Sequence, residues 1–67
     1  MQAWKKKQEK AAKLVKEARN ILDEYEGKEL PEEKEKQIDE MMRDAQKLKE
    51  EVDREKKLHD MDQYFNE

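Results

Sequence analysis

The stretch Glu26-Gly27-Lys28-Glu29-Leu30-Pro31 divides the sequence into two halves, each with a regular pattern of apolar residues. Gly27 and Pro31 are the only glycine and the only proline of the chain. Glycine readily adopts the left-handed conformation that closes a helix, so we expect Gly27 at the C′ position. Proline has the φ that suits the first turn of a helix, and it pushes Leu30 toward an extended backbone. The stretch therefore predicts a turn over residues 27–30 between two antiparallel helices.

The half before the turn has the heptad pattern of an amphipathic helix. The a positions, seven residues apart, are Trp4, Ala11, Ala18 and Tyr25. The d and e positions from the second heptad on are Leu14, Val15, Ile21 and Leu22. The first heptad is weaker, because Lys7 and Gln8 stand at its d and e positions. We expect a helix over about residues 3–26 whose a, d and e positions face a partner.

The half after the turn repeats this pattern. Its apolar positions are Ile38, Met41, Met42, Ala45, Leu48 and Val52. Glu32 and Glu33 place negative charge at the expected helix start, where the helix dipole favours it. We therefore expect a second helix over about residues 31–65. Met41 and Met42 fit core positions d and e better than an adaptable binding surface.

Beyond Val52 the apolar residues leave the heptad. Continued spacing puts Glu55 at d and His59 at a, whereas the apolar residues are Leu58, Met61 and Phe65. Either the supercoil tightens there or the end of the helix faces something different, and we favour the second explanation. His59 is then expected to be a solvent-exposed helical residue, since Lys56 stands where the Glu-x-x-His motif of di-iron sites needs a glutamate.

Folding the helices back on each other predicts an overhang at the C-terminal end. Trp4 is expected near Val52 to Glu55, so the residues from about Lys56 on extend past the first helix by roughly 15 Å. This end also carries Tyr64 beside Phe65. We consider the overhang the best candidate for a functional surface. Trp4 is either an anchor of an oligomer contact or a frayed terminal residue.

Composition excludes several classes of protein. Of the 67 residues 52% are charged and 33% are apolar, which allows one small domain without the concave apolar walls of an enzyme pocket. The absence of cysteine excludes disulfides and thiolate metal sites, and the absence of serine and threonine excludes their hydroxyls as nucleophiles. No apolar run is long enough to span a membrane, and no secretory signal is recognisable. We expect no enzyme, cofactor or metal site.

The charges favour a helical hairpin over a disordered polyelectrolyte. Glu, Lys and Arg favour helix, and the two signs nearly cancel to a net charge of −3. Residues 1–19 carry +5 (seven Lys or Arg, two Glu), and residues 20–67 carry −8 (nine Lys or Arg, seventeen Asp or Glu). This asymmetry suits an antiparallel pair. The lysine cluster beginning at Lys5-Lys6-Lys7 is better explained as a solvated helix side than as a nucleic-acid contact, because the whole chain is acidic.

Two helices cannot surround their own seam, so we expect the hairpin to self-associate or to pack on another domain. The residues expected at the helix–helix or oligomer interface are Trp4, Leu14, Val15, Ile21, Leu22, Tyr25, Ile38, Met41, Met42, Leu48, Val52, Leu58, Met61 and Phe65. The turn residues are Gly27, Leu30 and Pro31.

Several of these segments resemble the N-terminal region of tailed-phage major capsid proteins with the Hong-Kong-type capsid fold. The similar segments are Ala18-Arg19-Asn20-Ile21-Leu22-Asp23, Glu26-Gly27-Lys28-Glu29-Leu30 and Glu32-Glu33. The family's later D-x-[LM]-M-x-x-[AV]-x-x-L pattern is matched by Asp39, Met41, Met42, Ala45 and Leu48, and its closing segment by Val52 and Glu55. The resemblance covers about residues 11–58. Pro31 departs from it, because the family often has Ser or Thr there, which would cap the second helix.

The resemblance implies an internal scaffolding segment, often called the delta domain. In the family this segment precedes the shell domain, lies inside the immature capsid in the host cytoplasm, and helps subunits assemble into procapsids. A maturation protease commonly removes it. The implied partners are other copies, other capsid subunits and that protease. The alternatives are a coiled-coil docking module for a different partner, a designed helical hairpin and, less favoured, a basic-helix nucleic-acid binder.

Overall fold

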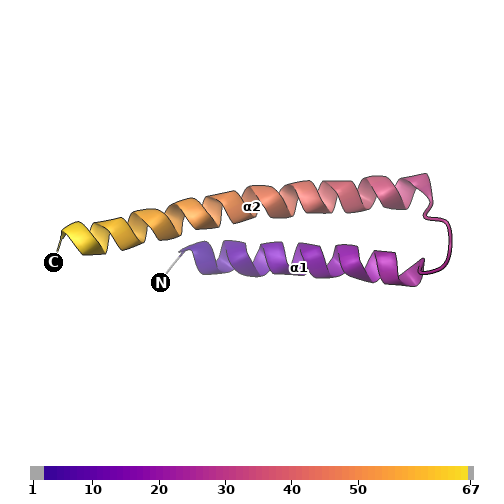
Figure 1. The fold of residues 1–67 in the computed structure, drawn as a ribbon, viewed down its shortest axis with the longest axis horizontal. Coiled ribbons are helices and arrows are strands. Elements are labelled where there is room, and N and C mark those ends of the chain that lie inside the picture. The colour runs from indigo at the N-terminus through magenta and orange to yellow at the C-terminus, as the bar shows by residue number, and fades with distance from the viewer. Residues whose placement is uncertain (1–2, 67) are drawn as a thin grey trace.

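The chain folds as two α-helices joined by a tight turn, and the computed structural model describes residues 3–66. Helices α1 (Ala3–Glu24) and α2 (Glu32–Phe65) run in opposite directions, and α2 extends past the start of α1 (Figure 1). The molecule measures 56 × 16 × 15 Å. The antiparallel helical hairpin that the sequence predicts is confirmed.

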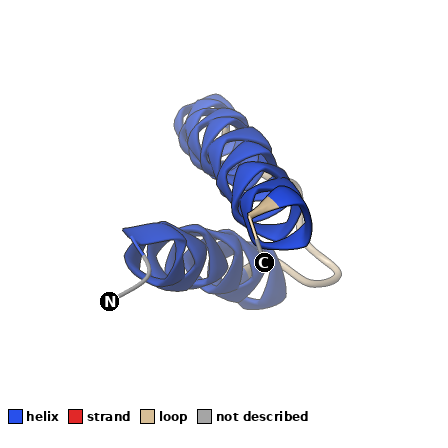
Figure 2. Cartoon of the chain, turned by 90° about the vertical axis from the view of Figure 1, so that its left-hand side faces the viewer, coloured by secondary structure: helices blue, strands red, loops and turns tan. Residues whose placement is uncertain are grey.

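The two helices are inclined to each other, as the view along the long axis shows (Figure 2). Helices that pack along a heptad seam cross at an angle, because the side-chain ridges of one helix fit the grooves of the other. The inclined pair is therefore coiled-coil-like. Within residues 3–66 the structure contains no strand.

The turn begins two residues earlier than the sequence predicts, because α1 ends at Glu24. Just beyond it, the Tyr25 N–H donates to the Leu22 carbonyl at 3.1 Å, an i to i−3 bond that tightens the end of the helix. The Lys28 N–H then donates to the Tyr25 carbonyl at 2.8 Å and closes a four-residue turn. Gly27 is the third residue of this turn with φ 75°. Its positive φ thus serves the turn itself, and it is not the C′ residue directly after α1.

Helix α2 begins at Glu32, one residue later than predicted, and Pro31 is its N-cap. Pro31 has φ −61° and ψ 148°, and its carbonyl accepts a hydrogen bond from the Glu35 N–H at 3.0 Å. No side chain caps this end, but Glu32, Glu33 and Glu35 lie in the first turn. Their negative charge favours the helix start through the dipole.

The core of the hairpin is thin. Among the described residues the buried apolar side chains are Ala18, Ala45 and Val52, at 3%, 6% and 4% exposure. Half-buried residues continue the seam: Trp4, Lys7, Ala11, Leu14 and Ile21 on α1, Tyr25 just after α1, and Lys34, Ile38, Met41, Leu48, Glu55 and His59 on α2. All of these residues stand at a or d positions, and Glu51 at a g position is half-buried beside them. The seam is therefore a two-position heptad stripe, and small residues occupy its centre.

The e positions lie outside this seam, contrary to the sequence analysis. Val15, Leu22 and Met42 are 46%, 51% and 52% exposed. A helix with one neighbour buries the two positions that face that neighbour, and a third position is buried only against a further element. Placing Met42 in the core of the hairpin was therefore wrong, whereas Met41 is half-buried in the seam.

Candidate interaction surfaces

Two side-chain pairs fix the register at the open end of the hairpin. The Lys7 Nζ lies 3.1 Å from Glu55 Oε1, forming an ion pair and a hydrogen bond between the two helices. About one helical turn further toward the open end of the hairpin, the rings of Trp4 and His59 pack against each other, with centroids 5.1 Å apart and planes tilted by 59°. The predicted level of Trp4 between Val52 and Glu55 is therefore wrong by about one turn.

These pairs continue the regular heptad through Glu55 and His59. His59 is half-buried against Trp4 and is not the solvent-exposed residue that the sequence analysis expected. Lys7 occupies the d position of the first heptad, the heptad that has the fewest apolar residues. Its ion pair with Glu55 keeps it in the seam. The helix pairing thus extends further than the apolar pattern indicated, and the overhang of α2 begins after His59, not at about Lys56.

The ion pair is incompletely satisfied. Lys7 and Glu55 have side-chain exposures of 37% and 34%, so the pair is partly shielded from solvent. The second carboxylate oxygen, Glu55 Oε2, is buried and accepts no hydrogen bond from any described residue. Such a pair contributes little net stability, but a polar pair within an apolar seam discriminates against other registers.

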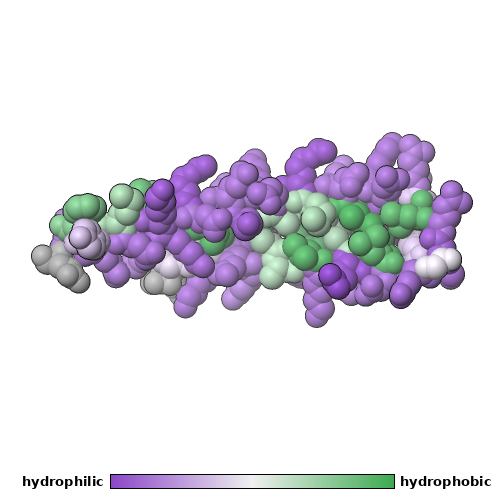
Figure 3. All heavy atoms as spheres, in the orientation of Figure 1, coloured by the Kyte–Doolittle hydropathy of each residue, from purple (hydrophilic) through white to green (hydrophobic). Residues whose placement is uncertain are grey.

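One flank of the seam carries a shallow apolar groove of about 300 Å³. We define the apolar groove by its lining residues: Gln8, Ala11, Ala12, Val15, Met42, Ala45, Gln46 and Lys49. Of these, Lys49 alone is charged. Leu22 stands at the next e position toward the turn and is also exposed. Apolar side chains gather across both helices between the middle of the molecule and the turn, surrounded by hydrophilic residues (Figure 3).

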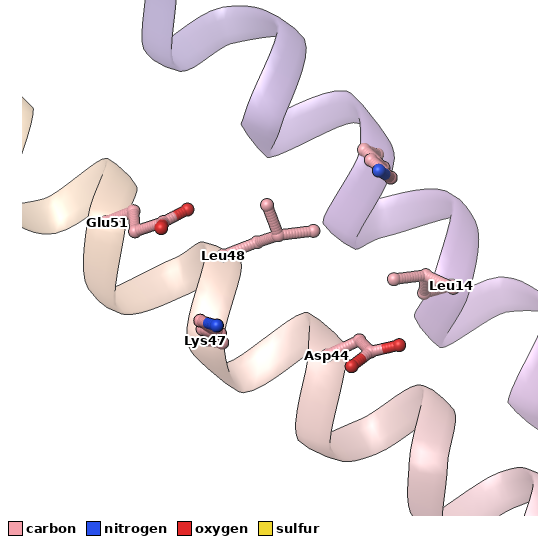
Figure 4. Close-up of a pocket in the computed structure, with 6 residues that line it drawn as sticks. Leu14, Asp44, Lys47, Leu48 and Glu51 are labelled. Atoms are coloured by element: carbon pink, nitrogen blue, oxygen red, sulfur yellow. The ribbon is translucent and has the colours of Figure 1, made fainter.

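The opposite flank of the seam is charged. A second groove of about 320 Å³ is lined by Lys10, Leu14, Asp44, Lys47, Leu48 and Glu51. Leu14 and Leu48 point into the space between the helices, and Asp44 and Glu51 stand beside them (Figure 4). In the heptad this flank holds g positions and the apolar groove holds e positions. The hairpin is therefore amphipathic as a whole, with one apolar and one polar flank.

The C-terminal overhang is a third surface. Leu58, in the last turn that faces α1, and Met61 and Phe65 on the overhang form a stripe of apolar residues on α2 and are 62%, 48% and 72% exposed. Tyr64, 78% exposed, packs edge-on against Phe65 with ring centroids 4.9 Å apart. Within the hairpin these residues are not part of the seam, and the expectation that this end faces something different stays a prediction.

The hairpin exposes more surface than a compact protein of its size. It exposes 6114 Å², whereas a compact 8.2-kDa monomer exposes about 4,500 Å². Its radius of gyration is 16.3 Å, against about 11 Å for a compact chain of this length. The difference in area, about 1,600 Å², equals the total area of a standard protein–protein interface.

In residues 3–66, no three His, Asp or Glu side chains are grouped so that they could hold a metal ion. The described helices also include none with the length and apolar character needed to cross a membrane.

Comparison with known proteins gives no relative for this chain. No protein-family model, no curated protein and no solved structure matches it.

Proposed function

We propose that this hairpin is a self-associating scaffolding segment of a tailed-phage major capsid protein, which brings capsid subunits together during procapsid assembly. The observation that carries the proposal is the apolar surface left bare on a hairpin whose described core is Ala18, Ala45 and Val52. A protein with so small a core and so much exposed area gains stability by associating.

The resemblance to capsid proteins supports this particular kind of association. The residues that carry its second pattern lie on the seam side of α2: Met41, Ala45 and Leu48 contribute to the seam, and Met42 borders the apolar groove. The pattern thus includes one apolar residue, Met42, that the hairpin itself does not bury and that is available to a neighbouring molecule. This is the arrangement that an assembly segment needs.

Weak association suits the proposed role. The large apolar side chains exposed on the groove side of the hairpin are few, namely Val15, Leu22 and Met42, so any one contact between hairpins is modest and dissociates quickly. A shell under construction needs contacts that can break, because misplaced subunits must leave before the shell closes. In this proposal the segment acts inside the immature capsid in the host cytoplasm and is then removed by the maturation protease.

The direct test is assembly with and without the hairpin. The complete reading frame that contains residues 1–67 is expressed in one version as it is and in another without these residues, and particles are counted by electron microscopy. We expect closed shells from the first and unassembled subunits or irregular aggregates from the second. A reading frame that ends at Glu67, or equal numbers of normal shells from both versions, would overturn the proposal.

Removal of the segment has a separate test. Mature and immature particles are compared by mass spectrometry of their major protein. We expect peptides of residues 1–67 in immature particles and their loss from mature ones. Retention of these peptides at full stoichiometry in mature particles contradicts the proteolytic step but leaves scaffolding intact.

The exposed overhang favours one alternative, a docking module for a different protein. Leu58, Met61 and Phe65 would then bind the partner, and the hairpin would act as its rigid base. The two functions differ in solution. A strictly monomeric, fully helical hairpin, as measured by light scattering over a concentration series, contradicts the scaffolding proposal and favours the docking module.

A further inference from the structure

We propose that the apolar groove is covered by a second copy of this chain, which lies antiparallel on the first and completes a four-helix bundle. The inference rests on the self-association proposed above and adds the surface, the orientation and the facing charges. It follows from three properties of the described residues: the composition of the groove, the charges along its two sides and the area left exposed.

The groove is an uncharged region on a highly charged molecule. Charged residues make up 52% of the chain, yet Lys49 is the one charged residue among the eight that line the groove. Val15, Leu22 and Met42, each about half exposed, lie on this flank. In a twofold dimer each of these side chains is covered in both copies. Apolar burial is the main favourable term in association.

The charged residues beside the groove differ between its two ends. They stand at the e and b positions of the two helices and are all exposed. Toward the turn they are Arg19, Glu32, Glu35 and Asp39, with Glu26 just after the end of α1, a net charge of −3. Toward the open end, within the paired length up to His59, they are Lys5, Lys49, Lys56 and Asp53, a net charge of +2, and Asp60 at the next b position lies on the overhang. The flank therefore has an acidic end and a basic end.

This polarity selects the orientation of the second copy. Two hairpins that stack on this flank about a twofold axis point either in the same direction or in opposite directions. The same direction sets acidic end against acidic end, whereas opposite directions set each acidic end against a basic one, which is favourable. With the axis at the level of Ala45, Lys56 lies within about one residue rise of the partner's Glu35, and Lys49 within about two of the partner's Asp39.

The exposed area is sufficient for such a dimer. Each chain exposes about 1,600 Å² more than a compact monomer of its mass. A standard interface takes about 800 Å² from each partner. Covering one flank therefore accounts for about half of the excess, and the overhang remains outside the bundle.

Charge reversal tests the orientation. One variant carries Glu35→Lys and Asp39→Lys, and the other carries Lys49→Glu and Lys56→Glu. Each alone sets like charges together in the antiparallel dimer, so we expect each to sediment at 8.2 kDa at concentrations where the natural chain dimerises. Mixed in equal amounts, they regain opposite charges at both ends, and we expect a heterodimer of twice that mass.

Two results would overturn the antiparallel arrangement. One is a mixture that stays monomeric while circular dichroism shows both variants to be fully helical. The other is a single charge-reversal variant that dimerises as well as the natural chain. If reversal unfolds a variant, the neutral pair Glu35→Gln with Asp39→Asn replaces it, and an unchanged dissociation constant for that pair counts against the inference.

Lysine substitutions test the surface. Leu22→Lys and Met42→Lys change exposed positions, so we expect helicity to persist while the dimer dissociation constant rises about a hundredfold, since each change enters the interface twice. The matched control is Leu58→Lys, just before the overhang and outside the groove, which we expect to leave the constant unchanged. A natural chain that never dimerises refutes the proposed self-association itself. A natural dimer that Leu58→Lys disrupts and Leu22→Lys does not refutes only the groove as its surface.

Discussion

Lys7 and Glu55 put a charged pair where a regular heptad seam has apolar residues. Their ion pair is 3.1 Å long and partly exposed, and Glu55 Oε2 has no partner among the described residues. We expect the double variant Lys7→Leu with Glu55→Leu to unfold at higher urea than the natural chain, by about 1 kcal/mol or more. An apolar layer avoids the desolvation of two charges and leaves no unpaired oxygen.

The single variants give the matched controls for this prediction. Lys7→Leu leaves the Glu55 carboxylate half-buried without its cation, so we expect it to lose about 1 kcal/mol. Glu55→Leu leaves a lysine that can turn to solvent, so we expect a change within about 0.5 kcal/mol. Equilibrium unfolding of all four proteins at one concentration measures these values. A double variant no more stable than the natural chain would contradict the prediction and show that the ion pair is worth at least as much to the hairpin as an apolar layer.

His59 shows where the sequence was misleading at the residue scale. Hydrophobicity alone predicted that the seam ends near Val52, because Glu55 and His59 are polar and Leu58 is not. The seam continues because each polar residue has a partner on α1, Lys7 for Glu55 and Trp4 for His59. These partnerships depend on the register between helices that are far apart in the sequence, which no periodicity within one helix reveals.

The turn between the two helices depends on one residue, Gly27. Gly27 has φ 75°, a conformation that side chains with a Cβ rarely adopt. Apart from Gly27 itself and its two chain neighbours, no residue has an atom within 4 Å of the position that a Cβ would take, so the cost of Gly27→Ala is backbone strain alone. We expect Gly27→Ala to lower the free energy of unfolding by about 1–2 kcal/mol, measured by urea unfolding at fixed concentration.

Gly27→Asn is the graded control for this strain. Asparagine tolerates the left-handed region better than alanine, so we expect Gly27→Asn to lose less than Gly27→Ala although its side chain is larger. An asparagine variant that is less stable than the alanine variant would show that side-chain crowding, and not positive φ, makes glycine necessary in this turn.

The two helices and the turn were predictable from the sequence, whereas the width of the buried stripe was not. Heptad spacing and the single Gly and Pro located both helices to within two residues at each end. The a and d positions, such as Leu14 and Leu48, line the seam as expected. Val15 and Met42 look the same in the sequence as these core residues, and they are exposed because the hairpin supplies only one neighbouring helix.

The whole molecule is rod-shaped, and its buried side chains are concentrated in the middle of its length. The buried residues Ala18, Ala45 and Val52 lie along the central seam, whereas the overhang has no facing helix (Figure 1). An isolated end of a helix gains hydrogen bonds but little burial, so it opens more readily than a packed segment. Local stability is therefore expected to fall steeply along α2 from Val52 to Phe65.

Hydrogen exchange measured residue by residue tests this gradient. At high dilution we expect the amides of residues 61–65 to exchange fastest within α2 and those of residues 42–52 slowest, because only the latter must break packed contacts to open. At concentrations where hairpins associate, the antiparallel bundle adds protection along the paired lengths of both helices and leaves residues 61–65 as fast as before. Equal protection of residues 61–65 and 42–52 at dilution would mean that the overhang is stabilised within the single chain. Protection that rises with concentration only in residues 61–65 would instead place the association at the overhang.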